Sequence, residues 1–291
     1  MIYKRLLGLT IAFVALTLIF WVVEFFWPGV PAQRKLRRGY LLDTLYWFFT
    51  PLITKSVTQI GVLVVLVPTM LLLGRSLDHA TVAAGYGPIL ALPKWLQAVA
   101  ILVLGDFIAY WSHRWFHGRR LWPFHAVHHS SQELDWLSSV RLHPVNELVT
   151  RLCQAVPFVA LGFSPVVLAA YVPFLTFYSI LIHANVSWTL GPLRYVVASP
   201  EFHRWHHTCE EEALNKNFAG LLPFWDMVFG TFYLPREKRP TRFGIQGNPV
   251  PDDFWGQMMY PFRRSPRAAE ISAATEAAGF VREAGSDGAP G

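Results

Sequence analysis

The stretch LLGLTIAFVALTLIFWVVEFFW, residues Leu6 to Trp27, is an apolar run of 22 residues in which Glu24 is the only charged side chain. A helix needs about 20 consecutive apolar residues to cross the hydrocarbon core of a bilayer. A secretory signal peptide would have a shorter apolar core and a small-residue cleavage site such as AxA, and neither is evident here. The run therefore predicts a transmembrane helix.

The composition of the whole chain agrees with a membrane protein. Hydrophobic residues make up 53% of the 291 residues and charged residues only 15%, whereas soluble proteins carry roughly 25% charged residues. The 22 Phe, 12 Trp and 10 Tyr supply side chains that favour lipid interfaces. In such a chain a net charge of +6 favours contact with anionic lipid headgroups, so we expect no nucleic-acid partner.

Further apolar segments follow the first. Val57 to Gly74 and Leu96 to Trp111 are each near the lower length limit for a span. Glu147 to Phe163 and Pro165 to Ile182 predict a helical hairpin that turns at residues 162–165, where Gly and Pro cluster. We therefore predict an all-α, polytopic membrane protein with four or five spanning segments and a cytoplasmic helical cap.

Basic residues set the expected orientation. The loop after the first span holds four of them within residues 34–38, against two at residues 4–5 before it, so the positive-inside rule places that loop in the cytoplasm. Alternation of the spans then puts residues 75–94 outside and every histidine cluster on the cytoplasmic side. The short, proline-interrupted segment Tyr40 to Thr54 is expected to be interfacial or re-entrant.

Three regions follow from these features. Residues 1–39 hold the first transmembrane helix and the basic cytoplasmic loop. Residues 40–262 form the expected membrane-embedded catalytic domain. Residues 263–291 are rich in Ala, Glu, Ser and Gly, and this composition predicts a disordered tail.

Histidine is the residue whose distribution stands out, because ten of the eleven lie between His113 and His207. They occur in three boxes, HRWFH at residues 113–117, HAVHH at 125–129 and HRWHH at 203–207. On a helix, residues separated by three or four positions lie on one side about one turn apart, so their imidazoles can reach a common ion.

Each box also has a structural interpretation, since a single HxxxH pair at a membrane surface is more often solvated than bound to metal. Three boxes on the same predicted membrane face favour a shared metal site instead. Neutral imidazole suits Zn, Cu, Fe and Ni, so the ligand type does not name the metal. Eight box histidines exceed the four ligands of a structural zinc and suffice for two adjacent ions.

In this order, and interleaved with apolar spans, the boxes resemble those of the fatty acid hydroxylase and sterol desaturase superfamily of integral membrane di-iron oxygenases. The resemblance extends over about Asp43 to Phe232 and does not single out a member. Supporting motifs are Asp106 before the first box, RLHP at 141–144, HANV at 183–186, PEFH at 200–203, Asn217 and WDMVFGT at 225–231.

The resemblance implies a set of metal ligands and neighbouring residues. Some members of the superfamily have a further histidine at the position of Ser187, and this departure leaves one iron with a position that water or Asn185 could fill. Asp106 is expected to orient a ligand imidazole rather than to form a structural pair within its span. The sequence leaves three roles open for His143: a metal ligand, a hydrogen-bond partner of a ligand, or the first residue of a helix. Asp226 is expected to be structural. The implied ligands are His113, His117, His125, His128, His129, His203, His206 and His207, with His183 as a further one.

The activity implied by the resemblance is oxidation of a lipid. Two non-haem Fe ions, reduced by an external donor, would use O₂ to hydroxylate or desaturate a C–H bond of a fatty acyl chain, a sterol or a related lipid, and zinc could replace iron in purified material. No GxGxxG fingerprint for a flavin or NAD is present. Electrons are therefore expected from a ferredoxin- or cytochrome b5-like protein, and the substrate from the bilayer.

Other metal-dependent classes fit less well. A metal-binding or metal-transport membrane protein is the main alternative, but transporters place polar ligands near the middle of the membrane, whereas these boxes follow the ends of spans. A haem carrier would use isolated axial histidines. A zinc protease would carry HExxH, which does not occur.

Overall fold

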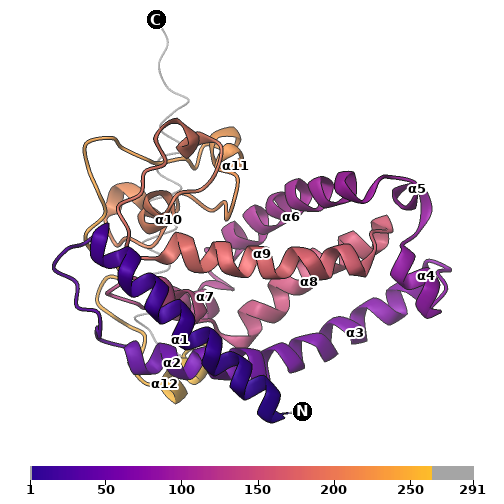
Figure 1. The fold of residues 1–291 in the computed structure, drawn as a ribbon, viewed down its shortest axis with the longest axis horizontal. Coiled ribbons are helices and arrows are strands. Elements are labelled where there is room, and N and C mark those ends of the chain that lie inside the picture. The colour runs from indigo at the N-terminus through magenta and orange to yellow at the C-terminus, as the bar shows by residue number, and fades with distance from the viewer. Residues whose placement is uncertain (1, 264–291) are drawn as a thin grey trace, which may run out of the picture.

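The computed structural model describes residues 2–263 of the chain, so the tail expected over residues 264–291 lies outside the described residues. Within residues 2–263 the secondary structure is helical, with two isolated β-bridges and no strand. The prediction of an all-α protein is confirmed. Figure 1 shows the long helices lying together, with the short helices gathered at their two ends.

Among the residues that the structure describes, three helical stretches are long and apolar enough to cross a membrane. They are α1 (Ile2–Phe26), the continuous stretch Tyr40–Leu72, and α6 (Lys94–Phe116). Side chains along these helices are largely exposed, as expected for surfaces that face lipid.

The stretch Tyr40–Leu72 combines two segments that the sequence suggested were separate. It contains α2 (Tyr40–Phe49), a π-helical turn (Thr50–Thr54) and α3 (Lys55–Leu72). Pro51 cannot donate a backbone hydrogen bond, and the chain accommodates it in the π turn without ending the helix. At 1.5 Å per residue the stretch is about 50 Å long, which exceeds the roughly 30 Å hydrocarbon core. One end therefore extends beyond the core of a bilayer.

The predicted hairpin is present as α8 (Pro144–Leu161) and α9 (Pro165–His183). Gly162 ends α8 with φ 94°, a conformation that glycine adopts without steric cost. Within the described part of α9, Tyr171–His183 is a shorter apolar helix. The count of four or five spans stays a prediction.

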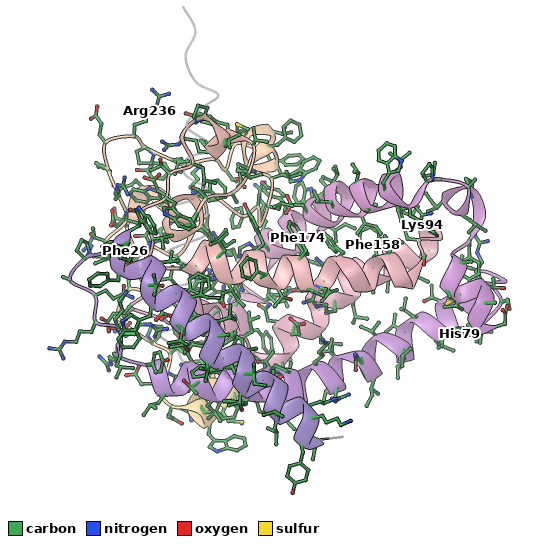
Figure 2. All side chains as sticks on the ribbon, viewed as in Figure 1. Phe26, His79, Lys94, Phe158, Phe174 and Arg236 are labelled. Carbon is green, nitrogen blue, oxygen red and sulfur yellow. The ribbon has the colours of Figure 1, made fainter. Side chains whose placement is uncertain are left out.

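The short helices divide between two ends of the molecule (Figure 1). At one end lie α4 (His79–Ala84) and α5 (Gly87–Leu90). Toward the other lie α7 (Trp122–His129), α10 (Pro200–His206), α11 (Phe224–Val228) and α12 (Phe254–Met259). Figure 2 places His79 at the first end, and Phe26 and Arg236 at the second. Short 3-10 turns cover Trp136–Val140, Gly191–Tyr195, Glu211–Ala213 and Tyr260–Phe262.

A buried aromatic cluster supports α10 against α6. Tyr110 of α6 packs with Phe202 and Trp205 of α10 and with Phe218 of the loop that follows. Burying a large apolar side chain contributes about 1.5 to 3 kcal/mol. Trp205 lies inside the third histidine box, so this box presents histidines on one side while its indole faces the core.

A buried ion network ties the basic loop to the segment between α7 and α8. Arg37 contacts Asp43 at 2.6 Å and Asp135 at 2.5 Å, and Arg141 contacts Asp43 at 2.6 Å. All four side chains are almost fully buried. Buried charges are tolerated when they are paired in this way, so the network joins segments almost 100 residues apart in the chain.

Candidate metal centre

Nine histidines form two groups, each able to hold a metal ion. Within a group, one nitrogen per residue lies within 4.8 Å of the others. Two nitrogens on opposite sides of an ion, each about 2.1 Å from it, would be about 4.2 Å apart, so both groups have nearly the required size. The five-histidine group contains His113, His117, His125, His129 and His206, and the four-histidine group contains His128, His183, His203 and His207.

The helices explain which histidine joins which group. Residues four apart on a helix differ by only about 40° in direction, whereas consecutive residues differ by about 100°. His125 and His129 therefore face the same group, and His128 faces the other. In the third box His203 and His207 share a group, and His206 joins the partner group. Each HxxHH box thus contributes to both groups.

Hydrogen bonds at Nδ1 orient four of these imidazoles. A backbone carbonyl can only accept, so a ring that bonds to one must carry its proton on Nδ1, which leaves Nε2 with a free lone pair. His113 donates to the Phe218 carbonyl at 2.7 Å and His206 to the Lys216 carbonyl at 2.8 Å. The other two are His128, which donates to Arg141 O at 3.2 Å, and His183, which donates to Ser179 O at 2.6 Å.

His125 has a side-chain partner instead. Its Nδ1 lies 2.8 Å from Oδ1 of Asn146, which is buried in the first turn of α8. Sequence analysis did not identify Asn146. The available signal was a polar side chain three residues after His143 at the start of an otherwise apolar helix.

The arrangement of the Nε2 atoms fits a cation. In the five-histidine group, Nε2 of His125 lies 3.0 Å from Nε2 of His113 and 3.2 Å from Nε2 of His129. In the other group, Nε2 of His183 lies 3.2 Å from that of His128 and 3.1 Å from that of His203. In the His113–His125 and His128–His183 pairs, the hydrogen bonds at Nδ1 leave a lone pair on both Nε2 atoms. Two such lone pairs that face one another repel unless a cation lies between them.

Unpaired nitrogens give a second, independent indication of fit. Nε2 of His117 and Nε2 of His206 are both buried without a hydrogen-bond partner. A buried polar atom without a partner costs free energy, and a metal bond would remove that cost. The residues present therefore fit a transition-metal ion in each group.

Burial also keeps the rings in the protonation state that binds metal. Loss of solvation lowers the pKa of several box histidines well below the usual 6.5, and neighbouring histidines lower it further, so they are neutral near pH 7. Metals bind the neutral imidazole. The box histidines concerned are His125, His128, His129, His203, His206 and His207.

Comparison with known proteins agrees with this geometry. The fatty acid hydroxylase family model matches residues 98–231, which include all nine histidines. Residues 98–231 are thus similar to the fatty acid hydroxylase family. The resemblance seen in the histidine boxes is therefore confirmed.

Individual relatives come from several branches of lipid metabolism. Ornithine lipid hydroxylase OlsE of Rhizobium tropici is 34% identical over 60% of this chain and 53% of its own length. Human alkylglycerol monooxygenase is 37% identical over 46% of this chain and 30% of its own length. A rice very-long-chain aldehyde decarbonylase, GL1-5, is 31% identical over 48% and 25%. The chain thus spans about half or less of these proteins, and no solved structure matches it significantly.

Two residues expected to act at the metals have backbone groups as hydrogen-bond partners. The carboxylate of Asp106 accepts from the backbone N–H groups of Leu221 at 2.9 Å and Leu222 at 2.8 Å, and the described residues show no hydrogen bond between it and an imidazole. The side chain of Asn185 forms two hydrogen bonds with the backbone of Val30. Its Oδ1 accepts from the Val30 N–H at 2.8 Å, and its Nδ2 donates to the Val30 carbonyl at 3.2 Å. In both cases the described partners are backbone groups of distant segments, so a role of either residue at the metals stays a prediction.

His143 belongs to neither histidine group. Its Nδ1 accepts from the N–H of Val145 at 3.1 Å, which caps the start of α8, and its Nε2 donates to the Met258 carbonyl at 3.1 Å. Of the three roles open from the sequence, the structure places His143 in that of a helix-start residue.

Proposed function

We propose that this chain is a membrane-bound non-haem di-iron oxidoreductase, which uses O₂ and external electrons to hydroxylate or desaturate a lipid C–H bond. The observation that carries the proposal is the pair of adjacent histidine groups inside the fatty acid hydroxylase domain. Relatives named as a lipid hydroxylase and a lipid monooxygenase support oxidation of a lipid. The five-histidine group would hold one iron and the four-histidine group the other.

The chemistry that such iron supplies when bound is activation of O₂. The protein's own contribution is orientation and exclusion of water. Hydrogen bonds at Nδ1 hold the rings so that their Nε2 lone pairs converge, and this preorganisation favours metal binding. Both α7 and α10 contribute to both groups, which keeps the two sites adjacent. Most of the nine histidines are buried, which keeps bulk water away from the site.

The partners follow from the same proposal. The lipid would enter laterally from the bilayer, and the electrons would come from a ferredoxin- or cytochrome b5-like protein. We propose that the histidine cap faces the cytoplasm, as the four basic residues at 34–38 suggest. This orientation would let a soluble electron donor reach the cap.

Metal analysis and product analysis together test the function. Protein purified after expression in iron-supplied cells should contain two irons per chain. With a reducing system and O₂, it should convert a membrane lipid to a product that has gained one oxygen atom or lost two hydrogen atoms, and omission of the reductant serves as the control. If only redox-inert zinc is bound and no lipid changes, the alternative of a metal-binding or metal-transport protein is favoured.

A further inference from the structure

Two buried carboxylates hold the loop at residues 218–222, which borders the five-histidine group. Asp226 accepts from the N–H groups of Phe218 and Ala219, each at 2.8 Å. Asp106 accepts in the same manner from the N–H groups of Leu221 and Leu222. Both carboxylates are buried. Each accepts hydrogen bonds from two consecutive backbone N–H groups of the same loop.

Only Asp226 is connected to a metal-site histidine. The carbonyl of Phe218 and the N–H of Ala219 belong to one planar peptide unit. That carbonyl accepts from Nδ1–H of His113 at 2.7 Å, while the N–H donates to Oδ2 of Asp226 at 2.8 Å. A continuous series therefore runs from the carboxylate through the peptide to the imidazole.

Hydrogen bonds in series polarise one another, and the effect is stronger where the local dielectric constant is low. Negative charge at the N–H side of the peptide increases the negative partial charge on its carbonyl oxygen. Metal-bound histidines commonly donate their second N–H to a carboxylate or a carbonyl, which raises the basicity of the ligand nitrogen. His113 donates directly to a carbonyl, that of Phe218, and this carbonyl is in turn polarised by the carboxylate of Asp226.

We infer that Asp226 is a positioning residue that acts through the Phe218–Ala219 peptide on His113, fixing its tautomer and strengthening its Nε2 as a metal ligand. This inference rests on the proposed metal-dependent function. The three described hydrogen-bond partners of the carboxylate are all donors, namely the two N–H groups and the Thr231 hydroxyl at 2.6 Å. The two N–H groups can only donate, and with the Thr231 hydroxyl donating as well, the two carboxylate oxygens accept three hydrogen bonds. Such a set of donors favours the anion against the rise in pKa that burial of Asp226 causes.

His206 is linked through a peptide in the same way, but the group beyond that peptide is uncharged. His206 donates to the Lys216 carbonyl, and the N–H of that peptide, from Asn217, donates to the Thr231 carbonyl at 2.9 Å. The group beyond the peptide is thus a carbonyl for His206 and a carboxylate for His113. Charge, rather than the presence of a peptide link, distinguishes His113.

The chain offers a matched pair of variants. Asp226→Asn and Asp106→Asn each replace a buried carboxyl group that accepts from two N–H groups of the same loop with an amide of nearly the same size, but only Asp226 lies on the series to His113. With Asp226→Asn, we expect about tenfold weaker binding of Co²⁺ as a probe metal and a more positive Fe(III)/Fe(II) midpoint potential. Asp106→Asn should leave the potential unchanged. Equal shifts in both variants, or no shift with Asp226→Asn, would overturn the inference.

Two further measurements test the inference if Asp226→Asn fails to fold or if the protein binds no metal. Thr231→Val keeps the carboxylate but removes one competing donor, so the midpoint potential should move in the negative direction, and an unchanged potential would count against the inference. In metal-free protein, NMR of the His113 Nδ1 proton should show an upfield shift with Asp226→Asn. If wild-type protein bound no metal, the proposed function would fail, and this proton shift would still decide whether Asp226 acts on His113.

Discussion

His128 and His129 are consecutive in the chain, yet their imidazoles belong to different histidine groups, with ring planes 88° apart and centroids separated by 5.7 Å. His206 and His207 repeat the relationship at 89° and 5.4 Å. Consecutive helical residues point about 100° apart, so a short helix can supply both sites. Any change in α7 or α10 should therefore affect two metal sites together.

Replacing His128 or His206 with Ala removes one nitrogen from the four- or the five-histidine group, respectively. We expect bound iron and lipid product to fall together in each variant, because no other side chain replaces the missing imidazole. Membrane insertion should be retained, since neither residue lies in a candidate span. Metal content, product yield and membrane fractionation measure these effects.

His79→Ala is the matched control for both. His79 is exposed on α4, at the end opposite the histidine cap (Figure 2), so its loss should change neither iron content nor turnover. Normal activity and native iron content in both box variants would contradict the oxygenase proposal.

Asn146→Ala should weaken metal binding about 10- to 100-fold. The variant leaves Nδ1 of His125 without its acceptor and allows the ring to rotate or change tautomer. Asn146→Asp keeps an acceptor at the same position and should retain the metal. Titration with Co²⁺ compares the two variants, and equal losses in both would show that the hydrogen bond to His125 is unimportant.

Arg37→Met should destabilise the protein by on the order of 3 kcal/mol, because it leaves the buried carboxylate of Asp135 without its cation. Arg38 provides a control one residue away, since its ion pair with Asp252 is mostly exposed. Arg38→Met should change stability little. Thermal unfolding in detergent measures both variants, and similar losses would contradict a special role for the buried network.

The proposed orientation predicts that reporters fused after Arg120 or Arg236 will lie in the cytoplasm, while one placed at His79 will lie outside. Basic residues near the first span motivate this expectation. Paired reporters that are active on opposite sides of the membrane provide the measurement. A cytoplasmic signal at His79 together with external signals at the other two positions would reverse the topology.

Much of the site follows from local sequence. Apolar runs predicted the helices because a bilayer offers backbone groups no alternative partners. The Gly162 turn of the hairpin was also predictable, since glycine tolerates positive φ. Helical spacing alone predicts that His125 shares a site with His129, because residues four apart share a face.

Tertiary structure decided the rest. Only packing shows that α10 meets α7, that His183 joins the four-histidine group, and that α2 continues through Pro51 into α3. The hydrogen-bond partners of Asp106 and Asn185 could not be predicted, because they are backbone groups 115 and 155 positions away in the chain. Every residue type carries such N–H and C=O groups, so no side-chain pattern marks them. For the same reason the Phe218 peptide between Asp226 and His113 has no sequence signature, and only the folded chain brings the carboxylate, the peptide and the imidazole into line.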